Sequence, residues 1–449
     1  MRKNLKRIAC LLATVMCAFS ISACSTPGAL ESILESMGAW SSSSSDFSSE
    51  SLLDTASSSS SKKDSSSSKN ESASENHNSE LTSDSSVSSS LHSSSSIHSS
   101  SESSSFDSSE DSSWDSSEDS SENSSSSVED IEANEFSIHF LELGNQYTGD
   151  STLIKVGDVE VLIDAGSRKN SASTITKYVN QYCTDGVLEY VIATHAHEDH
   201  IAGFVGTSSA KGVFESFVCE TIIDYSLTNS TTQIREAYEK ARDAEVALGA
   251  THHTVLECWN NENGAQRSYE LGNGVTMNFL YQEFYEKNTS DENDYSVCML
   301  LSQGQNHYLF TGDLEEKGEA SLVKNNDLPK CQLYKAGHHG SKTSSTQALL
   351  SVIQPEIVCV CCCCGSTEYT TVNANTFPTQ AFVNRVAPYT DRVYVTTMVT
   401  TNGFTSMNGN IVVITKYSEV SVNCSNNNTL FKDTDWFKKN RTMPAAWKS

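Results

Sequence analysis

The sequence predicts an α/β domain over residues 134–424, in which two mixed β-sheets pack face to face and helices cover their outer faces. Past Val128, short apolar runs alternate with amphipathic segments, and these runs fall into two similar halves. By contrast, the first 130 residues carry too few apolar side chains to form a core. The folded part of the chain is therefore confined to the residues that follow about position 130.

The predicted elements follow from hydrophobic periodicity and from the turns between them. Residues 171–182 form a predicted helix with an apolar stripe that includes Ile175 and Val179. Residues 188–193 are nearly all apolar, as expected of a strand covered on both faces. The other strands are expected at 136–143, 151–156, 159–163, 275–280, 295–301, 307–311, 332–335, 357–362, 393–396 and 411–414. The other helices are expected at 231–248, 315–323, 345–353 and 379–386.

The amino terminus has the features of a secretory signal over residues 1–23. A basic start precedes an apolar run at 8–21 and the segment Ile-Ser-Ala-Cys ending at Cys24. Small residues before a cysteine resemble the lipobox of bacterial lipoproteins, which implies a lipid on Cys24 and anchoring to the outer face of the cytoplasmic membrane, with 24–40 as the lipidated segment. Two alternatives stay open: an ordinary cleaved signal, or a transmembrane helix, for which about 14 apolar residues are few.

Residues 41–130 are expected to be a disordered linker, because serine broken by single acidic residues cannot bury apolar surface. As a flexible coil such a segment spans on the order of 50 Å, which suits a tether but also a plain spacer. No role is predicted for residues 425–449 beyond packing on the domain.

The folded part is acidic, which limits its partners. Residues 134–449 carry 36 acidic and 23 basic side chains, a formal charge of −13. Broad electrostatic capture of nucleic acid needs clustered Lys and Arg, so this charge argues against it. A phosphodiester substrate that is held by metal ions remains compatible with this negative charge.

Five cysteines between 359 and 364 form a predicted buried strand. Free cysteine packs as a small hydrophobe, and adjacent thiols in a strand point to opposite faces, so the five cannot hold one metal ion together. The chain has 14 cysteines without the spacing of a disulfide framework. We expect reduced thiols with a structural role.

A cluster of metal-binding side chains follows strand 188–193. The segment Thr194-His195-Ala196-His197-Glu198-Asp199-His200 combines three imidazoles with carboxylates, the ligand types that zinc and similar metals prefer. The carboxyl end of a strand is also where open α/β sheets place ligands. The segment predicts a metal centre.

This segment is similar to the HxHxDH motif of the metallo-β-lactamase superfamily, and three further segments agree in order. Residues 161–166 (VLIDAG) resemble the first motif, and 308–313 (YLFTGD) resemble the strand that ends in a bridging aspartate. Residues 334–344 (YKAGHHGSKTS) resemble the late histidine motif of the branch related to the hydrolase domain of the DNA-uptake protein ComEC. The resemblance covers about 136–414 and implies the αββα sandwich of that superfamily.

The resemblance also implies a ligand set. His195 and His197 would hold a first metal; Asp199, His200 and His338 would hold a second; Asp313 would bridge the two. Asp164 and His339 would support these ligands from outside the coordination sphere. The cofactor would be one or two Zn²⁺ ions, with Mn²⁺ as an alternative, and the nucleophile a shared hydroxide. Asp199, His200 and Asp313 would be the catalytic core.

Residues Ser341, Lys342, Thr343 and Ser344 allow two interpretations. They would place a phosphate or carboxylate beside the metals, or they would cap the helix that follows.

Two departures from the family pattern bear on the site. A further histidine ligand to the first metal has no matching position, since His252 and His253 lie in a different context. Phe377 stands where the ComEC-like branch leads us to expect a histidine. Loss of that polar group from the rim of the site would change substrate preference.

The predicted function is a cell-surface metal-dependent hydrolase, most simply a phosphodiesterase or nuclease acting on nucleic acid or a nucleotide-like substrate. One alternative is hydrolysis of a lactone, an ester or a cell-wall phosphodiester, and another is a noncatalytic surface lipoprotein that binds a metal or a ligand. No protein partner can be inferred from the sequence.

Overall fold

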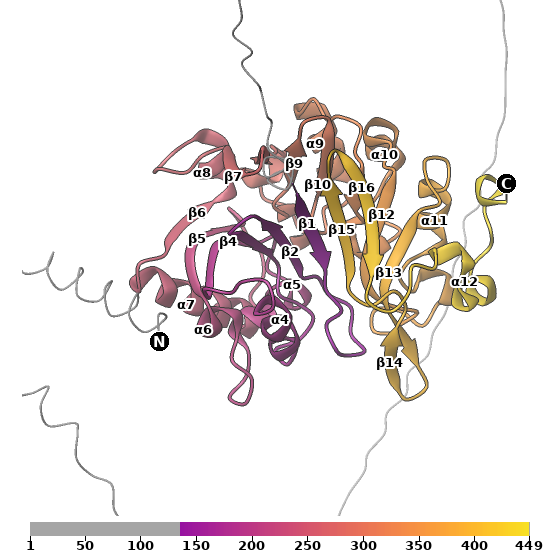
Figure 1. Cartoon of the computed structure of the whole chain (residues 1–449), viewed down its shortest axis with the longest axis horizontal. Helices are drawn as coiled ribbons and strands as arrows, with labels where there is room; N and C mark the ends of the chain where they lie inside the picture. Colours follow the sequence, from indigo (N-terminus) through magenta and orange to yellow (C-terminus); the bar gives the residue numbers. More distant parts are fainter. Residues whose placement is uncertain (1–134, 449) are drawn as a thin grey trace, which may run out of the picture. The chain divides into compact units, whose positions relative to one another are not determined.

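The computed structural model describes residues 135–448, and in this part of the chain two eight-stranded mixed sheets pack face to face with helices outside (Figure 1). The predicted αββα fold is confirmed. Four predictions fall outside the described residues: the signal over 1–23, the lipidation site Cys24, the segment 24–40 and the linker 41–130.

The first sheet has the strand order β16-β15-β1-β2-β3-β4-β5-β6. Its strands are β1 (Phe136–Phe140), β2 (Thr152–Val156), β3 (Val159–Ile163), β4 (Val187–Ala193), β5 (Val218–Asp224), β6 (Thr251–Thr254), β15 (Ile411–Lys416) and β16 (Glu419–Cys424). Strands β3 to β6 run parallel, and the remaining neighbours are antiparallel. The hairpin β15–β16 therefore returns from the end of the domain to lie beside β1.

The second sheet has the strand order β14-β13-β12-β11-β10-β9-β8-β7. Its strands are β7 (Ser268–Gly272), β8 (Val275–Phe279), β9 (Met299–Gln303), β10 (Asn306–Phe310), β11 (Leu333–Lys335), β12 (Ile357–Cys364), β13 (Val393–Thr400) and β14 (Gly403–Ser406). Strands β10 to β13 are parallel, as β3 to β6 are in the first sheet.

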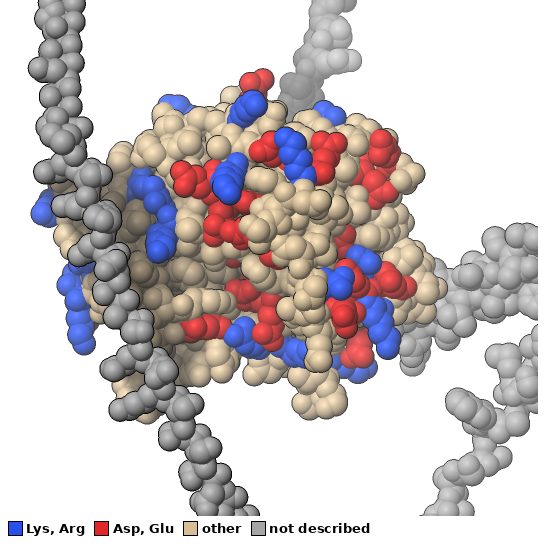
Figure 2. All heavy atoms as spheres, turned by 180° about the vertical axis from the view of Figure 1, so that it is seen from behind, with Lys and Arg blue, Asp and Glu red and all other residues tan. Residues whose placement is uncertain are grey.

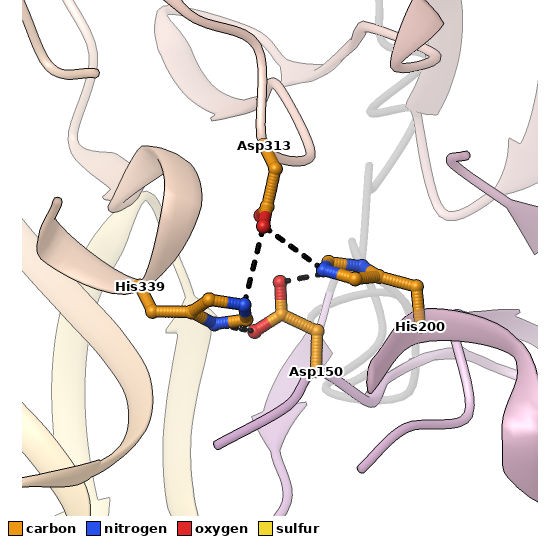
Figure 3. A group of neighbouring side chains, drawn as sticks. All are labelled: Asp150, His200, Asp313 and His339. Carbon is orange, nitrogen blue, oxygen red and sulfur yellow. Dashed lines mark ion pairs between the residues drawn. The ribbon is translucent and has the colours of Figure 1, made fainter. Parts of the chain in front are cut away.

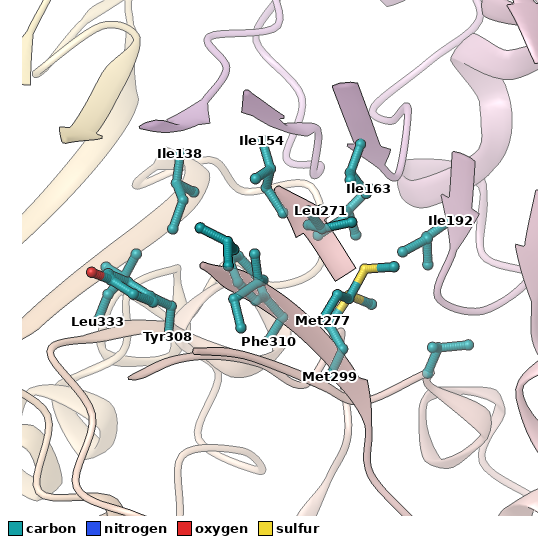
Figure 4. Packing of buried hydrophobic residues seen from close by; sticks show 14 of the residues in the cluster. Ile138, Ile154, Ile163, Ile192, Leu271, Met277, Met299, Tyr308, Phe310 and Leu333 are labelled. Carbon is teal, nitrogen blue, oxygen red and sulfur yellow. The ribbon is translucent and has the colours of Figure 1, made fainter. Parts of the chain in front are cut away.

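Alternating apolar residues of the two sheets form the central core (Figure 4). On the first sheet Ile138 and Ile163 point inward, and they meet Met277, Tyr308 and Phe310 from the second. Because side chains alternate between the faces of a strand, the neighbours of these residues face the outer helices. Burial on both faces explains why the central strands read as apolar runs.

Helices cover the outer faces, those of the first half on the first sheet and those of the second half on the second. They are α4 (Ser171–Val179), α5 (Glu198–Val205), α6 (Val213–Ser216), α7 (Gln233–Ala247), α9 (Glu316–Asn325), α10 (Gln347–Ile353), α11 (Gln380–Val386) and α12 (Asp435–Asn440). The short helix α8 (Val255–Asn260) instead buries Val255 and Cys258 in the core between the sheets. Single 3-10 turns are η2 (Glu283–Tyr285), η3 (Glu292–Tyr295), η4 (Gly337–Gly340), η5 (Asn373–Asn375), η6 (Phe431–Asp433) and η7 (Ala445–Trp447). Helix α5 was not expected from the sequence, because its short stripe is hidden among the polar motif residues.

The carboxyl-terminal segment packs on the second sheet. Phe431, Phe437 and Trp447 are buried in the cluster between this sheet and its helices. Among residues 135–448, no helix has the length and apolar character needed to cross a bilayer.

Candidate metal centre

Four loops meet at one edge of the two sheets, each following the carboxyl end of a strand. Asp164 follows β3, and Thr194–His200 follow β4 in the first sheet. Asp313 follows β10, and the pair 338–339 follows β11 in the second. Parallel strands end at the same edge, so these predicted site residues come together although 175 residues separate Asp164 from the last of them.

His200 is completely buried and its ring orientation is fixed. Its Nδ1 donates to Asp164 Oδ2 at 2.7 Å, which leaves Nε2 3.1 Å from Asp313 Oδ2. Asp164 in turn accepts from the backbone N–H and the hydroxyl of Thr194, both at 2.8 Å. Asp164 therefore holds the His200 ring from behind, with Nε2 free to bind a metal.

The two late histidines point in different directions. Both have left-handed backbone conformations, with φ 45° at His338 and 55° at His339, and this sharp turn separates their rings. His339 is completely buried; its Nδ1 donates to Cys361 O at 2.8 Å, and its Nε2 lies 3.2 Å from Asp313 Oδ2. His338 is partly exposed and lies 3.0 Å from Glu315 Oε1. We expected His338 as the ligand and His339 as its support, but the structure brings His339 into the cluster instead.

The remaining predicted ligands complete the cluster on the side of the first sheet. His195 Nε2 lies 3.0 Å from His197 Nδ1, while Nδ1 of His195 is 3.2 Å from the hydroxyl of Thr194. Asp199 Oδ2 lies 3.3 Å from His339 Nε2. His195, His197 and Asp199 thus lie close together beside the cluster.

Two further charged residues were not predicted to be in the cluster. Asp150 lies 3.3 Å from His339 Nδ1 and 3.8 Å from His200 Nδ1. The buried ammonium of Lys335 forms an ion pair with Asp150 and lies 3.6 Å from Asp313 Oδ1. Lys335 thus places one permanent positive charge among the carboxylates.

A signal for Asp150 was present in the sequence. The tight turn between the second and third strands fixes a register in which Thr152 lies opposite Ile163, so Asp150 must lie near the end of that strand. Lys335 ends a predicted strand just before the late histidines, which placed it near this edge, although the pattern did not show that its side chain turns into the cluster. Tyr369, described below, carried no comparable signal, because only the tertiary fold brings it to this edge.

The unpaired atoms of the cluster fit a bound metal. Asp150, His200, Asp313 and His339 each offer a ligand atom, and these atoms lie within 4.8 Å of one another (Figure 3). Several of them are buried without a hydrogen-bond partner: Nε2 of His200, Nε2 of His339, Oδ1 of Asp313 and Oδ1 of Asp150, whose other oxygen forms the ion pair with Lys335. Buried polar atoms are rarely left unpaired, so their concentration at one point is what a metal-binding site requires. A nitrogen and oxygen donor set suits Zn²⁺ and Mn²⁺.

The electrostatics of the cluster are dominated by its carboxylates. Burial alone would lower the pKa of His200, but Asp313 and Asp164 raise it well above its usual range. The pKa of His339 is raised for the same reason, against the effect of burial, chiefly by Asp313. Burial alone would raise the pKa of Asp199, but the imidazole of His339, 3.3 Å away, holds it well below its usual range. Without metal the cluster attracts positive charge.

A pocket of about 660 Å³ opens onto the cluster. Its lining includes Ala196, His197, Glu198, Asp199, Thr232, Gln233, Ile234, Asp313 and His338. Arg168, Lys169 and Tyr369 line it as well. The Tyr369 hydroxyl donates to Asp199 Oδ2 at 2.7 Å, and Arg168 pairs with Glu368 in the same loop as Tyr369. Lys169 has no carboxylate partner within the described chain.

The predicted anion-binding stretch 341–344 makes internal contacts. Thr343 Oγ1 donates to Glu315 at 2.7 Å, and Lys342 is exposed and lies outside the lining described for the pocket. The following helix is capped by Thr346, whose side chain accepts from Leu349 N, so the interpretation that residues 341–344 cap it is wrong. The cations that line the pocket are Arg168 and Lys169.

His252 and His253 lie away from the cluster, on the edge strand β6. His252 Nε2 is 2.8 Å from Asp224, which also binds Arg242 at 2.7 Å. Neither histidine supplies the missing ligand to the first metal.

Phe377 packs against the late histidines. Its ring centroid lies 5.6 Å from that of His338, 5.8 Å from that of His339 and 5.6 Å from that of Tyr369. An apolar ring therefore shields one side of the cluster where the sequence comparison led us to expect a polar group.

The cysteine-rich segment is a buried strand, as predicted. All eight residues of β12 are buried and its five thiols are free. Burial raises the pKa of Cys359, Cys361 and Cys362 well above the usual range, so these groups remain neutral thiols.

Comparison with known proteins gives a consistent picture. Residues 144–213 match the family model described as "Metallo-beta-lactamase superfamily". The chain is 28% identical over 263 residues to "Competence protein ComA" of Neisseria gonorrhoeae, which covers 58% of this chain and 30% of that protein. It is 26% identical over 214 residues to "Recombination protein 2" of Haemophilus influenzae, and this match covers 47% of this chain and 23% of that protein.

These relatives are longer proteins, and the match spans less than a third of each. Among solved structures, the metallo-beta-lactamase fold protein YhfI from Bacillus subtilis aligns over 59% of this chain and 96% of its own, with 11% identity and a TM-score of 0.35.

Proposed function

From the premise that this chain carries a domain of the metallo-β-lactamase superfamily, we propose that it is a metal-dependent hydrolase of phosphodiester bonds. The observation that carries the proposal is the buried cluster at the sheet edge, where ligand atoms from both sheets converge without hydrogen-bond partners. Its pocket is large enough for a substrate and exposes His197, Asp199 and Asp313.

We assign His195 and His197 to a first metal ion. Asp199, His200 and His339 are assigned to a second, and Asp313 is shared by both. The assignment of His339 replaces the predicted His338, because only the ring of His339 turns Nε2 toward Asp313 and Asp199. Asp150 lies close enough to these ligand atoms to be a further candidate.

Bound divalent ions would lower the pKa of the attacking water and neutralise charge that develops on the phosphoryl group. The protein's own groups have separate tasks. Asp164 and the carbonyl of Cys361 fix the two buried imidazoles so that Nε2 faces the centre. Lys335 offsets part of the carboxylate charge, and Lys169 is free to meet an anionic group of the substrate.

Nucleic acid or a nucleotide-like molecule is the proposed substrate class. The names of the relatives, a competence protein and a recombination protein, support this choice. Hydrolysis of a lactone, an ester or a cell-wall phosphodiester is the second candidate, and the acidic surface favours it. One face of the domain shows acidic and basic side chains interspersed, without a broad basic patch (Figure 2).

The first test combines metal analysis with substrate profiling on the full chain. We expect one to two equivalents of zinc or manganese, and metal-dependent cleavage of bis-p-nitrophenyl phosphate and of DNA that Asp199→Ala abolishes. Cleavage of lactones or esters alone would move the proposal to the second candidate. Protein that binds no metal when loaded with either ion would instead support a noncatalytic binding module.

We also propose that the protein is anchored to the bacterial cell surface through a lipid on Cys24. Cys24→Ala should then release the protein into the medium, as measured by fractionation and immunoblotting. Unchanged membrane association in this variant would contradict the proposal.

A further inference from the structure

Exposed aromatic side chains continue from the pocket along its rim. Tyr147 and Phe404 each expose 37% of their surface, and Tyr369 exposes 53%. These residues come from three separate segments, the β1–β2 loop, β14 and the loop after β12. Three aromatic rings exposed beside one site together form a surface that suits a ligand with flat faces.

Two hollows share this rim. Arg168 lines the pocket at the metal cluster, and its guanidinium lies over the Tyr147 ring, 4.5 Å from the centroid. Tyr147 and Phe404 line an adjacent hollow of about 350 Å³. The order from the cluster outward is therefore Asp199, Tyr369, Arg168, Tyr147 and Phe404.

We propose that Tyr147, Arg168 and Phe404 form a stacking subsite for successive bases of single-stranded nucleic acid that enters the metal centre. The subsite rests on the proposed phosphodiester chemistry and narrows its substrate. Bases of a single strand expose their faces to aromatic rings, whereas bases in a duplex are covered by their neighbours.

The charge of the domain supports a stacking mode over electrostatic capture. With a formal charge of −13 over residues 134–449, the domain repels a polyanion at long range. At the rim, Arg168 is already paired with Glu368, and Lys169 alone lines the pocket without a carboxylate partner in the described chain. Affinity would then come from the rings, and a single-strand complex with one or two phosphate contacts should show a salt slope of only about −1.

The test measures binding without cleavage. A fluorescein-labelled DNA single strand of 12 nucleotides, and the same sequence as a duplex, are titrated with the full chain in EDTA and followed by anisotropy. We expect the single strand to bind at least about ten-fold tighter than the duplex, and Tyr147→Ala or Phe404→Ala to weaken it about ten-fold. Tyr147→Trp and Phe404→Trp should restore binding, which separates stacking from a folding defect.

Tyr417→Ala is the matched control. Tyr417 is also 53% exposed, but it lies in the β15–β16 turn, at the end of the first sheet opposite to the metal centre. The proposal is overturned if the duplex binds as tightly as the single strand, or if both rim variants bind as the control does. This experiment involves no cleavage, so the two proposals can fail separately. Failure of the rim residues to bind the single strand would not contradict the proposed hydrolysis, and failure to hydrolyse phosphodiesters would not change the binding result.

Discussion

Two completely buried histidines of the cluster, His200 and His339, each have one ring nitrogen held by a fixed acceptor. Asp164 holds His200, and the carbonyl of Cys361 holds His339. A histidine whose Nδ1 donates in this way offers Nε2 as a lone pair, which is the form that binds a metal. His338 Nδ1 also faces a carboxylate, Glu315 at 3.0 Å, but its ring is partly exposed and, within the described chain, it forms no ion pair with Asp199 or Asp313 as His339 does.

This difference predicts unequal effects of two neighbouring substitutions. His339→Ala should weaken zinc binding by roughly 100-fold or more, because removal of a ligand costs more than removal of an outer partner. His338→Ala should change zinc affinity by less than about three-fold. Competition with a chromophoric chelator measures both, and a larger loss for His338→Ala would reverse the assignment.

Tyr369 supports Asp199 from the pocket side through a single hydrogen bond of 2.7 Å. Tyr369→Phe keeps the ring but removes the donor, so we expect zinc affinity to fall about ten-fold. The same chelator competition measures it, with Tyr417→Phe as the control at an exposed tyrosine far from the site. Equal affinities in the two variants would show that the hydroxyl does not position Asp199.

Backbone contacts between elements set the spacing of the site. Asp150 N donates to Asp199 O at 3.0 Å, and Gly166 N donates to Asp150 O at 2.8 Å. The backbone of Asp199 passes so close to Gly166 that a Cβ there would lie 1.5 Å from the Asp199 carbonyl oxygen. Glycine is required at this position because another chain segment occupies the space of a side chain.

Gly166→Ala should therefore destabilise the domain by about 3 kcal/mol, since overpacking forces the backbone to shift. Zinc affinity should fall with it, because the shifted segment carries Asp199. Gly304→Ala is the comparison: its φ is +59° but nothing lies near its added Cβ, so only about 1 kcal/mol is expected. Urea unfolding of both variants measures the difference, and equal costs would contradict the close approach.

At the scale of the whole molecule, the metal centre joins the two sheets. His195 to His200 follow a strand of the first sheet, whereas Asp313 and His339 follow strands of the second. A metal bound by both halves binds the folded state alone, so its binding free energy adds to the stability of the domain.

Zinc at 100 times its dissociation constant should therefore raise the free energy of unfolding by about 2.7 kcal/mol. Thermal unfolding of chelator-treated and zinc-loaded protein measures the gain. The double variant His200→Ala, Asp313→Ala should show none. An unchanged midpoint for the unsubstituted protein would mean that the metal does not bridge the halves.

The sequence by itself determined the αββα architecture and most of the residues that meet at the sheet edge. Apolar runs of strand length predict most strands of both sheets but miss β5, β6, β7, β14 and β16, and the motif residues follow strands whose carboxyl ends must share an edge. Hydrophobic periodicity lies within each segment, so it predicts a strand or a helix without knowledge of the segment that packs against it.

Only the tertiary structure decided which of two adjacent histidines faces the centre, and which outside residues join it. The orientation of His338 and His339 depends on two left-handed residues in one turn, and Lys335 and Tyr369 reach the site through strand order and loop packing. The pairing of β15 with β1 was equally undetermined, because pairing across more than 250 residues leaves no periodic trace in either segment. Contacts between distant segments depend on the assembled fold, and for that reason they could not be read from local pattern.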